Sequence, residues 1–154
     1  MTSRLVYLDT NVFIAGFESP ASNAEPVQDL LLALREKPGF AVTSELTLAE
    51  LLAPISRPHV LAPAERRRLY LDLLVGGGMI DLRPVTREIL IETADLRRTT
   101  RQKLPDAIHV ATALHADCRF FMSHDDGMRK LPEGLTRLHP DRAGAASIIE
   151  ALRG

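Results

Sequence analysis

Four acidic residues lie where chemistry is commonly placed in proteins of alternating strands and helices. Asp9 ends the β-favouring run "RLVYLD", and Asp125 follows the run "RFFMS" after one intervening residue. Asp106 opens the apolar stretch "LPDAIHVATAL", and Glu50 lies about two turns into an apolar helical segment. In open α/β sheets, ligands collect beyond the carboxyl ends of the strands, where helix N-termini also point. We therefore expect these four carboxylates to share one site.

Each acid also has an ordinary structural explanation. Asp9 could cap a helix, and Asp125 could open a turn with Asp126. Asp106 could complement a helix dipole, which contributes roughly 0.3 to 1 kcal/mol. Glu50 is harder to explain in this way, because an unpaired carboxylate in a packed helix is costly unless something neutralises it. The equivalent placement of all four favours a shared functional site.

The residue types at this site predict a cation. Clustered carboxylates repel one another, and a divalent cation compensates that repulsion. Oxygen ligands suit Mg²⁺, with Mn²⁺ as a substitute, and argue against zinc, which favours His and Cys. The histidines show no spacing typical of a metal-binding pair: His59, His109, His115, His124 and His139. His109 shares a helix face with Asp106, so it could line the site or be a packed, hydrogen-bonded side chain.

The composition limits the class of protein. A chain of 154 residues is most simply one domain, and 45% apolar with 25% charged residues is typical of soluble globular proteins. Cys118 is the only cysteine, which excludes an intramolecular disulfide and predicts a buried thiol in a reducing cytoplasm. No signal peptide or membrane span is expected. With a net charge of −1, nucleic-acid binding would need a local basic patch.

Strand and helix patterns alternate along the chain. Strands are predicted within residues 4–9, 40–43, 79–85, 119–123 and 135–139. Helices are predicted over 11–17, 27–37, 44 to a break at 56–58, 63–75, 86–99, 104 onward and 145–153. Residues 18–26 are predicted to form a loop, and the "RRR" run at 66–68 a solvated helix face. This alternation predicts a three-layer α/β/α domain with a central parallel sheet.

Four ordered motifs resemble those of PIN-domain nucleases, specifically VapC-type toxins of toxin–antitoxin pairs. They are "YLDTNVFI" (7–14), "LTLAELL" (46–52), "LPDAIHVATAL" (104–114) and "FMSHDDGM" (121–128). "LDTN" alone is a weak signal, whereas the four in family order are a strong one. The resemblance implies that residues 1–154 form a single PIN-like nuclease domain, with a parallel sheet of about five strands.

The resemblance also implies roles for individual residues. Asp9, Glu50, Asp106 and Asp125 match the catalytic, metal-holding acids, and Asn11 and Ser123 match small polar positions that support them. Two departures are visible in the fourth motif. His124 stands where an Asn is common, and Asp126 adds a second acid, so either Asp125 or Asp126 could face the metal.

The implied activity is endonucleolytic cleavage of single-stranded or loop RNA by metal-activated water. Phosphate binding needs cations, and the candidates flank the third and fourth acids: Arg97, Arg98, Arg101, Lys103, Arg129 and Lys130. For Arg97 and Arg98, a favourable charge at a helix C-terminus is an equal alternative. The family further implies an antitoxin protein as partner and a homodimer. Apolar residues in 27–37 and 64–75 exceed what one side of a small sheet obviously needs. Residue by residue, ordinary core is the more common explanation, and the resemblance tips the balance toward an interaction surface there.

Three other classes of protein share part of this pattern. A haloacid-dehalogenase-like phosphatase needs a second Asp where Asn11 stands, and a phospho-acceptor receiver domain needs an acid pair and a Lys that do not appear. The remaining alternative is a PIN-like module that binds RNA or protein without cutting. The complete set of acids counts against it.

Overall fold

A parallel sheet forms the centre of the molecule, whose computed structural model describes residues 4–53, 61–124 and 131–154. The sheet has five strands in the order β3-β2-β1-β4-β5, and every neighbouring pair is parallel. The strands are β1 (Val6–Leu8), β2 (Ala41–Ser44), β3 (Ile80–Arg83), β4 (Phe120–Met122) and β5 (Thr136–Leu138). This order confirms the predicted parallel sheet of about five strands.

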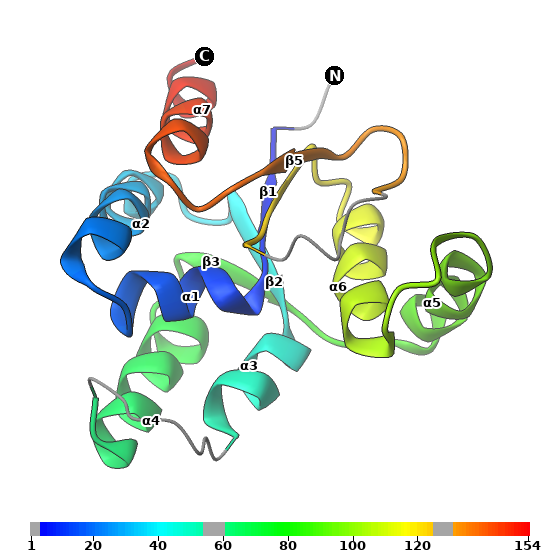
Figure 1. Cartoon of the computed structure of the whole chain (residues 1–154), viewed down its shortest axis with the longest axis horizontal. Helices are drawn as coiled ribbons and strands as arrows, with labels where there is room; N and C mark the ends of the chain where they lie inside the picture. Colours follow the sequence, from blue (N-terminus) through cyan, green and yellow to red (C-terminus); the bar gives the residue numbers. More distant parts are fainter. Residues whose placement is uncertain (1–3, 54–60, 125–130) are drawn as a thin grey trace.

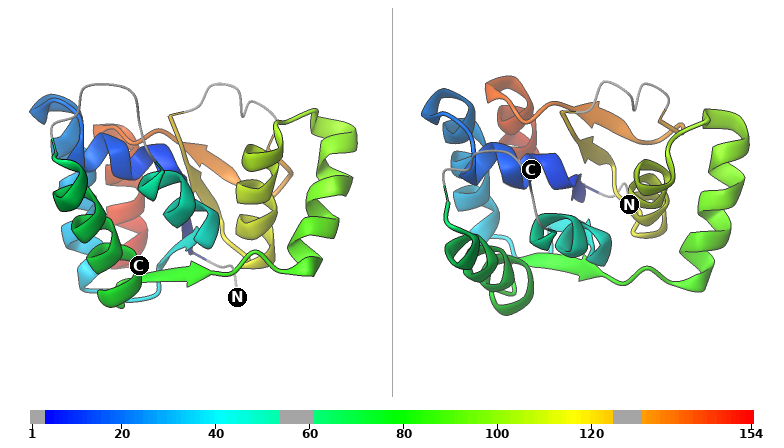
Figure 2. Two further views of the ribbon diagram at one scale, coloured as in Figure 1. Left: turned by 90° about the horizontal axis from the view of Figure 1, so that it is seen from below. Right: turned by 60° about the horizontal axis from the view of Figure 1, so that its bottom comes forward.

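Helices cover both faces of this sheet. They are α1 (Thr10–Phe17), α2 (Ala21–Arg35), α3 (Glu45–Leu52), α4 (Pro63–Leu71), a π-helical turn η1 (Asp72–Gly76), α5 (Arg87–Thr100), α6 (Leu104–His115) and α7 (Arg142–Arg153). Figure 1 shows α5 and α6 on one side of the strands and α1, α2, α4 and α7 on the other. The two further views in Figure 2 show the same separation. The three-layer α/β/α arrangement is therefore confirmed.

The alternation of side chains along β1 divides the core into two parts. Val6 and Leu8 point to the face covered by α2 and α7, where Leu30 and Ile148 pack against them. Tyr7 points to the opposite face, where Val110 of α6 belongs to the same cluster. Successive strand residues point to opposite faces of a sheet, so a buried central strand needs apolar residues at consecutive positions. One polar group nevertheless enters the second core, the hydroxyl of Tyr7.

Local signals in the sequence predicted several helix ends correctly. Ser44 caps α3 by accepting a hydrogen bond from the backbone N–H of Leu46, and Thr86 caps α5 by accepting one from Ile89. The stop predicted at Pro38-Gly39 is present, and Gly39 has a φ of 82°, which glycine adopts without steric cost. Among the described residues, no helix is long and apolar enough to cross a membrane.

The predicted loop at 18–26 is wrong for most of its length, because α2 begins at Ala21. Ala24 and Pro26 are buried in this first part of the helix. Pro26 has no backbone N–H, so it removes one hydrogen bond of the helix, and for this reason its presence in the sequence favours a loop. Burial of these positions against neighbouring helices outweighs that cost. Similarly, α7 begins at Arg142, earlier than predicted, because the Asp141 side chain accepts a hydrogen bond from the N–H of Gly144.

The apolar residues of α2 belong to the core, which the sequence left open as the alternative to an interaction surface. Val27, Leu30, Leu31 and Leu34 are all less than a tenth exposed. In the 64–75 segment Leu74 is buried, and Leu69 and Leu73 pack against the core partly buried. The large apolar side chains that remain exposed on these elements are Leu32 and Val75, each with 59% of its surface accessible.

The prediction of a solvated "RRR" face is wrong for Arg66, which is buried in α4. Its Nε donates to both carboxylate oxygens of Glu18 at 2.9 and 3.0 Å, and only 6% and 3% of the two side chains are exposed. The hydroxyl of Tyr70 donates to the same carboxylate at 2.6 Å. Glu18 lies at the C-terminal end of α1. This buried ion pair therefore ties α4 to α1.

Replacing Arg66 with Met should destabilise the fold by about 3–5 kcal/mol, because it leaves the Glu18 carboxylate buried without a cation. The matched control is Arg67→Met, which changes an exposed residue of the same helix. Urea unfolding monitored by circular dichroism measures the difference. The double variant Arg66→Met/Glu18→Gln should lose less than the sum of the single variants. Equal losses for Arg66→Met and Arg67→Met would contradict the pairing.

Candidate active site

The candidate site lies at the carboxyl edge of the sheet, between β1 and β4. From β1 the strands β2 and β3 follow one another on one side of the sheet. The chain then crosses to the other side, where β4 pairs with β1. Such a reversal of strand order opens a crevice where α/β proteins bind ligands. Asp9 directly follows β1, and Ser123 directly follows β4. The register of the two strands, in which Leu8 lies opposite Met122, brings these residues together.

Asp9 is almost completely buried, with 4% of its surface exposed, and both its carboxylate oxygens accept hydrogen bonds. Oδ1 accepts the backbone N–H of Thr10 at 2.9 Å, so Asp9 is the N-cap of α1. Oδ2 accepts the hydroxyl of Ser123 at 2.8 Å. The structure thus shows the capping role that the sequence left open, in a residue that also faces the candidate site.

Asn11 connects the two strand ends from α1. Its amide nitrogen lies 3.2 Å from the hydroxyl of Ser123 and 3.4 Å from Oδ2 of Asp9. Its amide oxygen accepts the backbone N–H of His124 at 2.9 Å. Asn11 and Ser123 therefore hold the Asp9 carboxylate in one orientation. His124 contributes its backbone to this arrangement.

Glu50 reaches the same region from α3. Its Oε1 accepts the hydroxyl of Thr10 at 2.8 Å and lies 2.6 Å from Nε2 of His109. Burial raises the pKa of this carboxyl, but the hydrogen bond and electrostatic attraction of His109 and the hydrogen bond from Thr10 outweigh burial and lower the pKa below its ordinary value. Glu50 is therefore held as the charged carboxylate that a cation would need.

His109 joins the two acids. Its Nε2 lies 2.6 Å from Oε1 of Glu50 and 3.5 Å from Oδ1 of Asp9. Its Nδ1 lies 2.6 Å from the hydroxyl of Tyr7, and the imidazole is 1% exposed. The sequence left two roles open for His109, lining the site or forming a packed and hydrogen-bonded part of the core. The structure shows both at once.

Of the other two candidate acids, the structure describes the third, Asp106, but not the fourth, Asp125. Asp106 is half-buried in the first turn of α6, one turn before His109 on the same helix. Asp125 and its neighbour Asp126 lie outside the described residues. Within the described ranges, no three His, Cys, Asp or Glu side chains are grouped closely enough to hold a metal ion. The structure thus brings Asp9 and Glu50 together around His109, with Asp106 on the helix that provides the imidazole.

The candidate RNA-binding residues fall into two groups. Arg97 and Arg98 lie in the last turn of α5, where their charge complements the helix dipole. Arg97 also donates to the backbone oxygen of Gln102 at 3.1 Å. Arg101 and Lys103 are exposed in the short connection that leads into α6 and Asp106. The last two candidates, Arg129 and Lys130, lie outside the described residues.

Two residues of this network, Tyr7 and Thr10, are not among the candidates that the sequence indicated. Both lie in the first acidic motif, "YLDTNVFI", beside Asp9. A usable signal was present for Tyr7, since a tyrosine in a buried central strand must find a partner for its hydroxyl. The signal for Thr10 was weaker, because Thr follows many strand-end acids as an ordinary helix residue.

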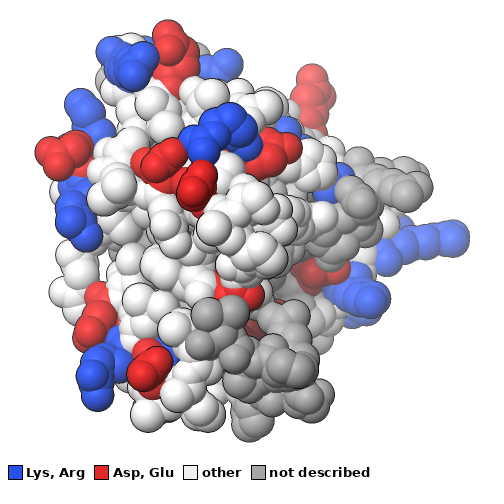
Figure 3. Space-filling view, turned by 60° about the vertical axis from the view of Figure 1, so that its left-hand side comes forward, with Lys and Arg blue, Asp and Glu red and all other residues white. Residues whose placement is uncertain are grey.

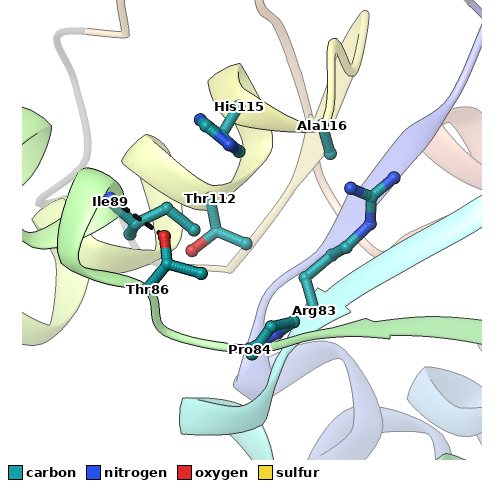
Figure 4. A pocket seen from close by; sticks show the side chains of 7 residues that line it. All are labelled: Arg83, Pro84, Thr86, Ile89, Thr112, His115 and Ala116. Atoms are coloured by element: carbon teal, nitrogen blue, oxygen red, sulfur yellow. Dashed lines mark hydrogen bonds between the residues drawn. The ribbon is translucent and has the colours of Figure 1, made fainter.

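A separate small pocket of about 130 Å³ lies between the end of β3 and the helices α5 and α6. Figure 4 shows Arg83, Thr86, Thr112 and His115 around it. The hydroxyls of Thr86 and Thr112 are bonded within their own helices. The residues of α6 and its C-cap that line the pocket follow Asp106 by six to ten positions, which corresponds to about 9 to 15 Å along the helix. We assign it no part in the site.

The match to a known family decides the identity of this fold. The family model for the PIN domain matches residues 6–134, which include Asp9, Glu50 and Asp106. The chain belongs to the PIN domain family. No curated protein matches this PIN domain by sequence. The matched segment contains the whole hydrogen-bonded network around Asp9.

Solved structures similar to this PIN domain include three complexes. A chain of a toxin–antitoxin complex from Klebsiella pneumoniae is 20% identical, with a TM-score of 0.61, 85% of this chain covered and 95% of that chain. VapBC2 from Rickettsia felis, bound to a promoter DNA fragment, is 15% identical, with a TM-score of 0.64 and coverage of 88% and 98%. FitAB bound to a DNA fragment is 20% identical, with a TM-score of 0.65 and coverage of 88% and 95%. At these identities the likeness shows a common fold.

The lowered pKa of Glu50 predicts how stability depends on pH in the absence of metal. A carboxyl whose pKa is lower in the folded state stabilises the fold above its unfolded pKa of about 4.3, and this contribution is lost as the pH falls through the folded pKa. The stability difference between wild type and Glu50→Gln should therefore stay constant from neutral pH to about pH 5.5 and shrink below it.

Urea unfolding in EDTA over that pH range measures this difference. The matched control is Glu25→Gln, which changes an exposed glutamate of α2. A Glu50→Gln difference that grows as the pH falls would contradict the direction of the pKa shift.

Proposed function

We propose that this PIN domain is a metal-dependent endoribonuclease that cleaves single-stranded or loop RNA. The observation that supports it most directly is the convergence of Asp9 and Glu50 on the imidazole of His109 at the carboxyl edge of the sheet. Two buried or half-buried carboxylates so close together repel each other unless positive charge compensates them. A divalent cation bound by these acids provides that compensation.

The donor chemistry of the described residues fits Mg²⁺ or Mn²⁺. The candidate ligands Asp9, Glu50 and Asp106 offer carboxylate oxygens, which hard divalent cations prefer. Asp125 or Asp126 would complete the set that the motifs imply. When bound, such a cation supplies an activated water and polarises a phosphate oxygen. We propose catalytic roles for Asp9, Glu50, Asp106 and Asp125 on this basis.

The chain's own residues prepare the acids for this role. Ser123 and Asn11 fix Oδ2 of Asp9, while the N-terminus of α1 fixes Oδ1. Thr10 and His109 keep Glu50 charged and hold it by Oε1. These contacts lower the cost of arranging like charges before a cation arrives. Preorganised ligands bind a metal more tightly than mobile ones, because less side-chain entropy is lost on binding.

We propose that RNA approaches over the connection between α5 and α6. Arg101 and Lys103 are exposed there, immediately before the helix that begins with Asp106 in its first turn. Arg97 and Arg98 extend the basic charge along α5, and Arg129 and Lys130, which follow the fourth motif in the sequence, are further candidates. Phosphate contacts of this kind position the backbone of the RNA beside the acids.

We further propose that the protein is the toxin of a toxin–antitoxin pair, that it pairs as a homodimer, and that an antitoxin protein binds it. The similar structures, which are toxin–antitoxin complexes, support this part. A hollow of about 250 Å³ between α2 and η1, lined in part by Leu32, Leu73 and Met79, is a candidate contact surface. On the face that includes α2, acidic and basic side chains are interspersed around an uncharged area (Figure 3).

Metal binding and cleavage should both depend on the acids. Mn²⁺ at about 100 times its Kd should stabilise the wild type by about 2.7 kcal/mol, because a ligand bound only by the folded state raises the melting temperature. Asp106→Asn should lose most of that gain. Cleavage of a mixed RNA pool by Asp106→Asn or Asp9→Asn should fall on the order of 100-fold or more.

The control for these variants is Asp29→Asn, which changes an exposed acid paired with Arg142 on the surface. Differential scanning fluorimetry with and without Mn²⁺, and gel analysis of labelled RNA, measure the two effects. If wild type binds Mn²⁺ and RNA but does not cut, the protein is instead a binding module with the same fold. Unchanged cleavage by both acid variants would contradict the nuclease assignment.

RNA affinity should fall linearly with salt on a logarithmic scale, because phosphate contacts release counterions. Replacing Arg101 and Lys103 with Ala should reduce the slope by about 1.4, since each contact on single strands contributes about 0.7. Binding is measured by fluorescence anisotropy in EDTA across a salt series. Arg35→Ala/Lys37→Ala is the matched control, because it removes one exposed Arg and one exposed Lys near the amino end of β2. An equal slope for the two double variants would place the RNA elsewhere.

A further inference from the structure

We propose that Tyr7 is a positioning residue for the metal centre, which acts by selecting the tautomer of His109 that donates its Nε2–H to Glu50. This inference rests on the function proposed above and adds two residues that the acidic motifs do not explain. Neither Tyr7 nor His109 is a metal ligand in this proposal. Their role is to set where the Glu50 carboxylate lies relative to Asp9.

Tyr7 is held rigidly in the core beneath the acids. It is fully buried, and its ring stacks on Phe121 of β4 with centroids 5.1 Å apart and planes 9° from parallel. Its ring also meets the imidazole of His109 edge-on, with centroids 5.8 Å apart. The hydroxyl oxygen lies 2.6 Å from Nδ1 of His109. A side chain packed on both sides in this way fixes the position of its hydroxyl.

The direction of this hydrogen bond follows from the groups that face the other nitrogen of the imidazole. A phenol hydroxyl can donate or accept, and the carboxylate oxygens that face Nε2 leave Nδ1 of a neutral imidazole as the acceptor for the Tyr7 hydroxyl. When that hydroxyl donates to Nδ1, the nitrogen must be an acceptor, and a neutral imidazole then carries its hydrogen on Nε2. A residue of β1 thereby determines which nitrogen of an α6 residue is a donor.

The opposite side of the imidazole needs a hydrogen on Nε2, which this tautomer supplies. Nε2 faces Oε1 of Glu50 at 2.6 Å and Oδ1 of Asp9 at 3.5 Å, both of which are acceptors when ionised. A lone pair on Nε2 would repel these oxygens, whereas an N–H attracts them. The hydroxyl of Thr10, which lies 3.4 Å from Nε2, already donates to Glu50. Tyr7 and the two acids therefore favour one arrangement from opposite sides.

This arrangement controls the spacing of the acids, because they come from different elements. Asp9 follows β1, whereas Glu50 belongs to the short helix α3, and the Glu50 side chain is 36% exposed. Among the described residues, the hydrogen bonds to Glu50 all converge on Oε1. Losing the bond from His109 would leave the Glu50 side chain held by Thr10 alone. Outer-shell contacts of this type commonly change metal affinity 10- to 100-fold.

The test compares two buried hydroxyls. Tyr7→Phe removes the proposed donor and keeps the ring, and Tyr70→Phe is the matched control, since the Tyr70 hydroxyl bonds the buried carboxylate of Glu18 away from the acids. Mn²⁺ affinity, measured by electron paramagnetic resonance without RNA, should fall about tenfold in Tyr7→Phe and less than about twofold in Tyr70→Phe. In cleavage assays Tyr7→Phe should raise the Mn²⁺ concentration needed for half-maximal rate.

Two further measurements separate positioning from a general structural effect. Long-range ¹H–¹⁵N spectra at about pH 8 should show His109 of the wild type as the Nε2–H tautomer and a mixture in Tyr7→Phe. In a His109→Gln background the donor is an amide that needs no tautomer selection. Adding Tyr7→Phe to that background should change Mn²⁺ affinity less than about twofold.

The outcomes distinguish this inference from the proposed function. A wild type that binds Mn²⁺ and cleaves RNA, with Tyr7→Phe unaffected, would overturn the positioning role alone. That role would also be overturned if wild-type His109 is an Nδ1–H tautomer or an imidazolium, or if Tyr7→Phe is equally harmful in the His109→Gln background. A wild type that neither binds Mn²⁺ nor cleaves RNA would overturn the proposed function and this role with it.

Discussion

The burial of the Asp9 carboxylate is the constraint on which the rest of the site depends. A nearly inaccessible charge is tolerated only where donors replace the water that it has lost. Here the donors are the first backbone N–H of α1, the amide of Asn11 and the hydroxyl that follows β4, and the imidazole of α6 lies 3.5 Å from Oδ1. The parallel pairing of β1 with β4 is what brings Ser123 to Asp9. A different strand order would leave the carboxylate without one of its partners.

The same constraint explains why polar residues accompany the acids inside an otherwise aliphatic core. Thr10, His109 and Tyr7 are all at least nine-tenths buried, and each is hydrogen-bonded. Their hydrogen bonds form a continuous chain from Tyr7 through His109 to Glu50. Buried polar networks stabilise one arrangement only when every member has a partner. The network therefore adds specificity to a region that must also hold like charges near one another.

The buried ion pair between Arg66 and Glu18 has a different role. It lies on the other face of the sheet and links α4 to the end of α1, the helix whose start is capped by Asp9. Breaking a buried pair leaves an uncompensated charge, so such pairs strongly favour the docked arrangement once it has formed. Helix α1 is thus held by a carboxylate at each end, one at the candidate site and one in the packing between helices.

The sequence by itself determined the elements and the chemistry of the acids. Periodicity and capping signals such as Ser44 and Thr86 act over a few residues, so they predicted the strands, most helices and the parallel α/β/α order. The four ordered motifs indicated the family that the match over residues 6–134 confirms. For Asp125 and Asp126, which lie outside the described residues, the sequence remains the source of the assignment.

Only the tertiary structure decided which side chains meet. The hydroxyl of Tyr7 and the imidazole of His109 are 102 residues apart in the chain, and Arg66 and Glu18 are 48 apart. Local sequence patterns predict that Tyr7 lies in a buried strand and that Arg66 lies in a helix. They do not predict which distant residue either side chain contacts. Residues 21–26 became helical for the same reason, since packing of Ala24 and Pro26 overrides the local preference for a loop. Long-range packing decides these contacts because burial is a property of the folded chain as a whole.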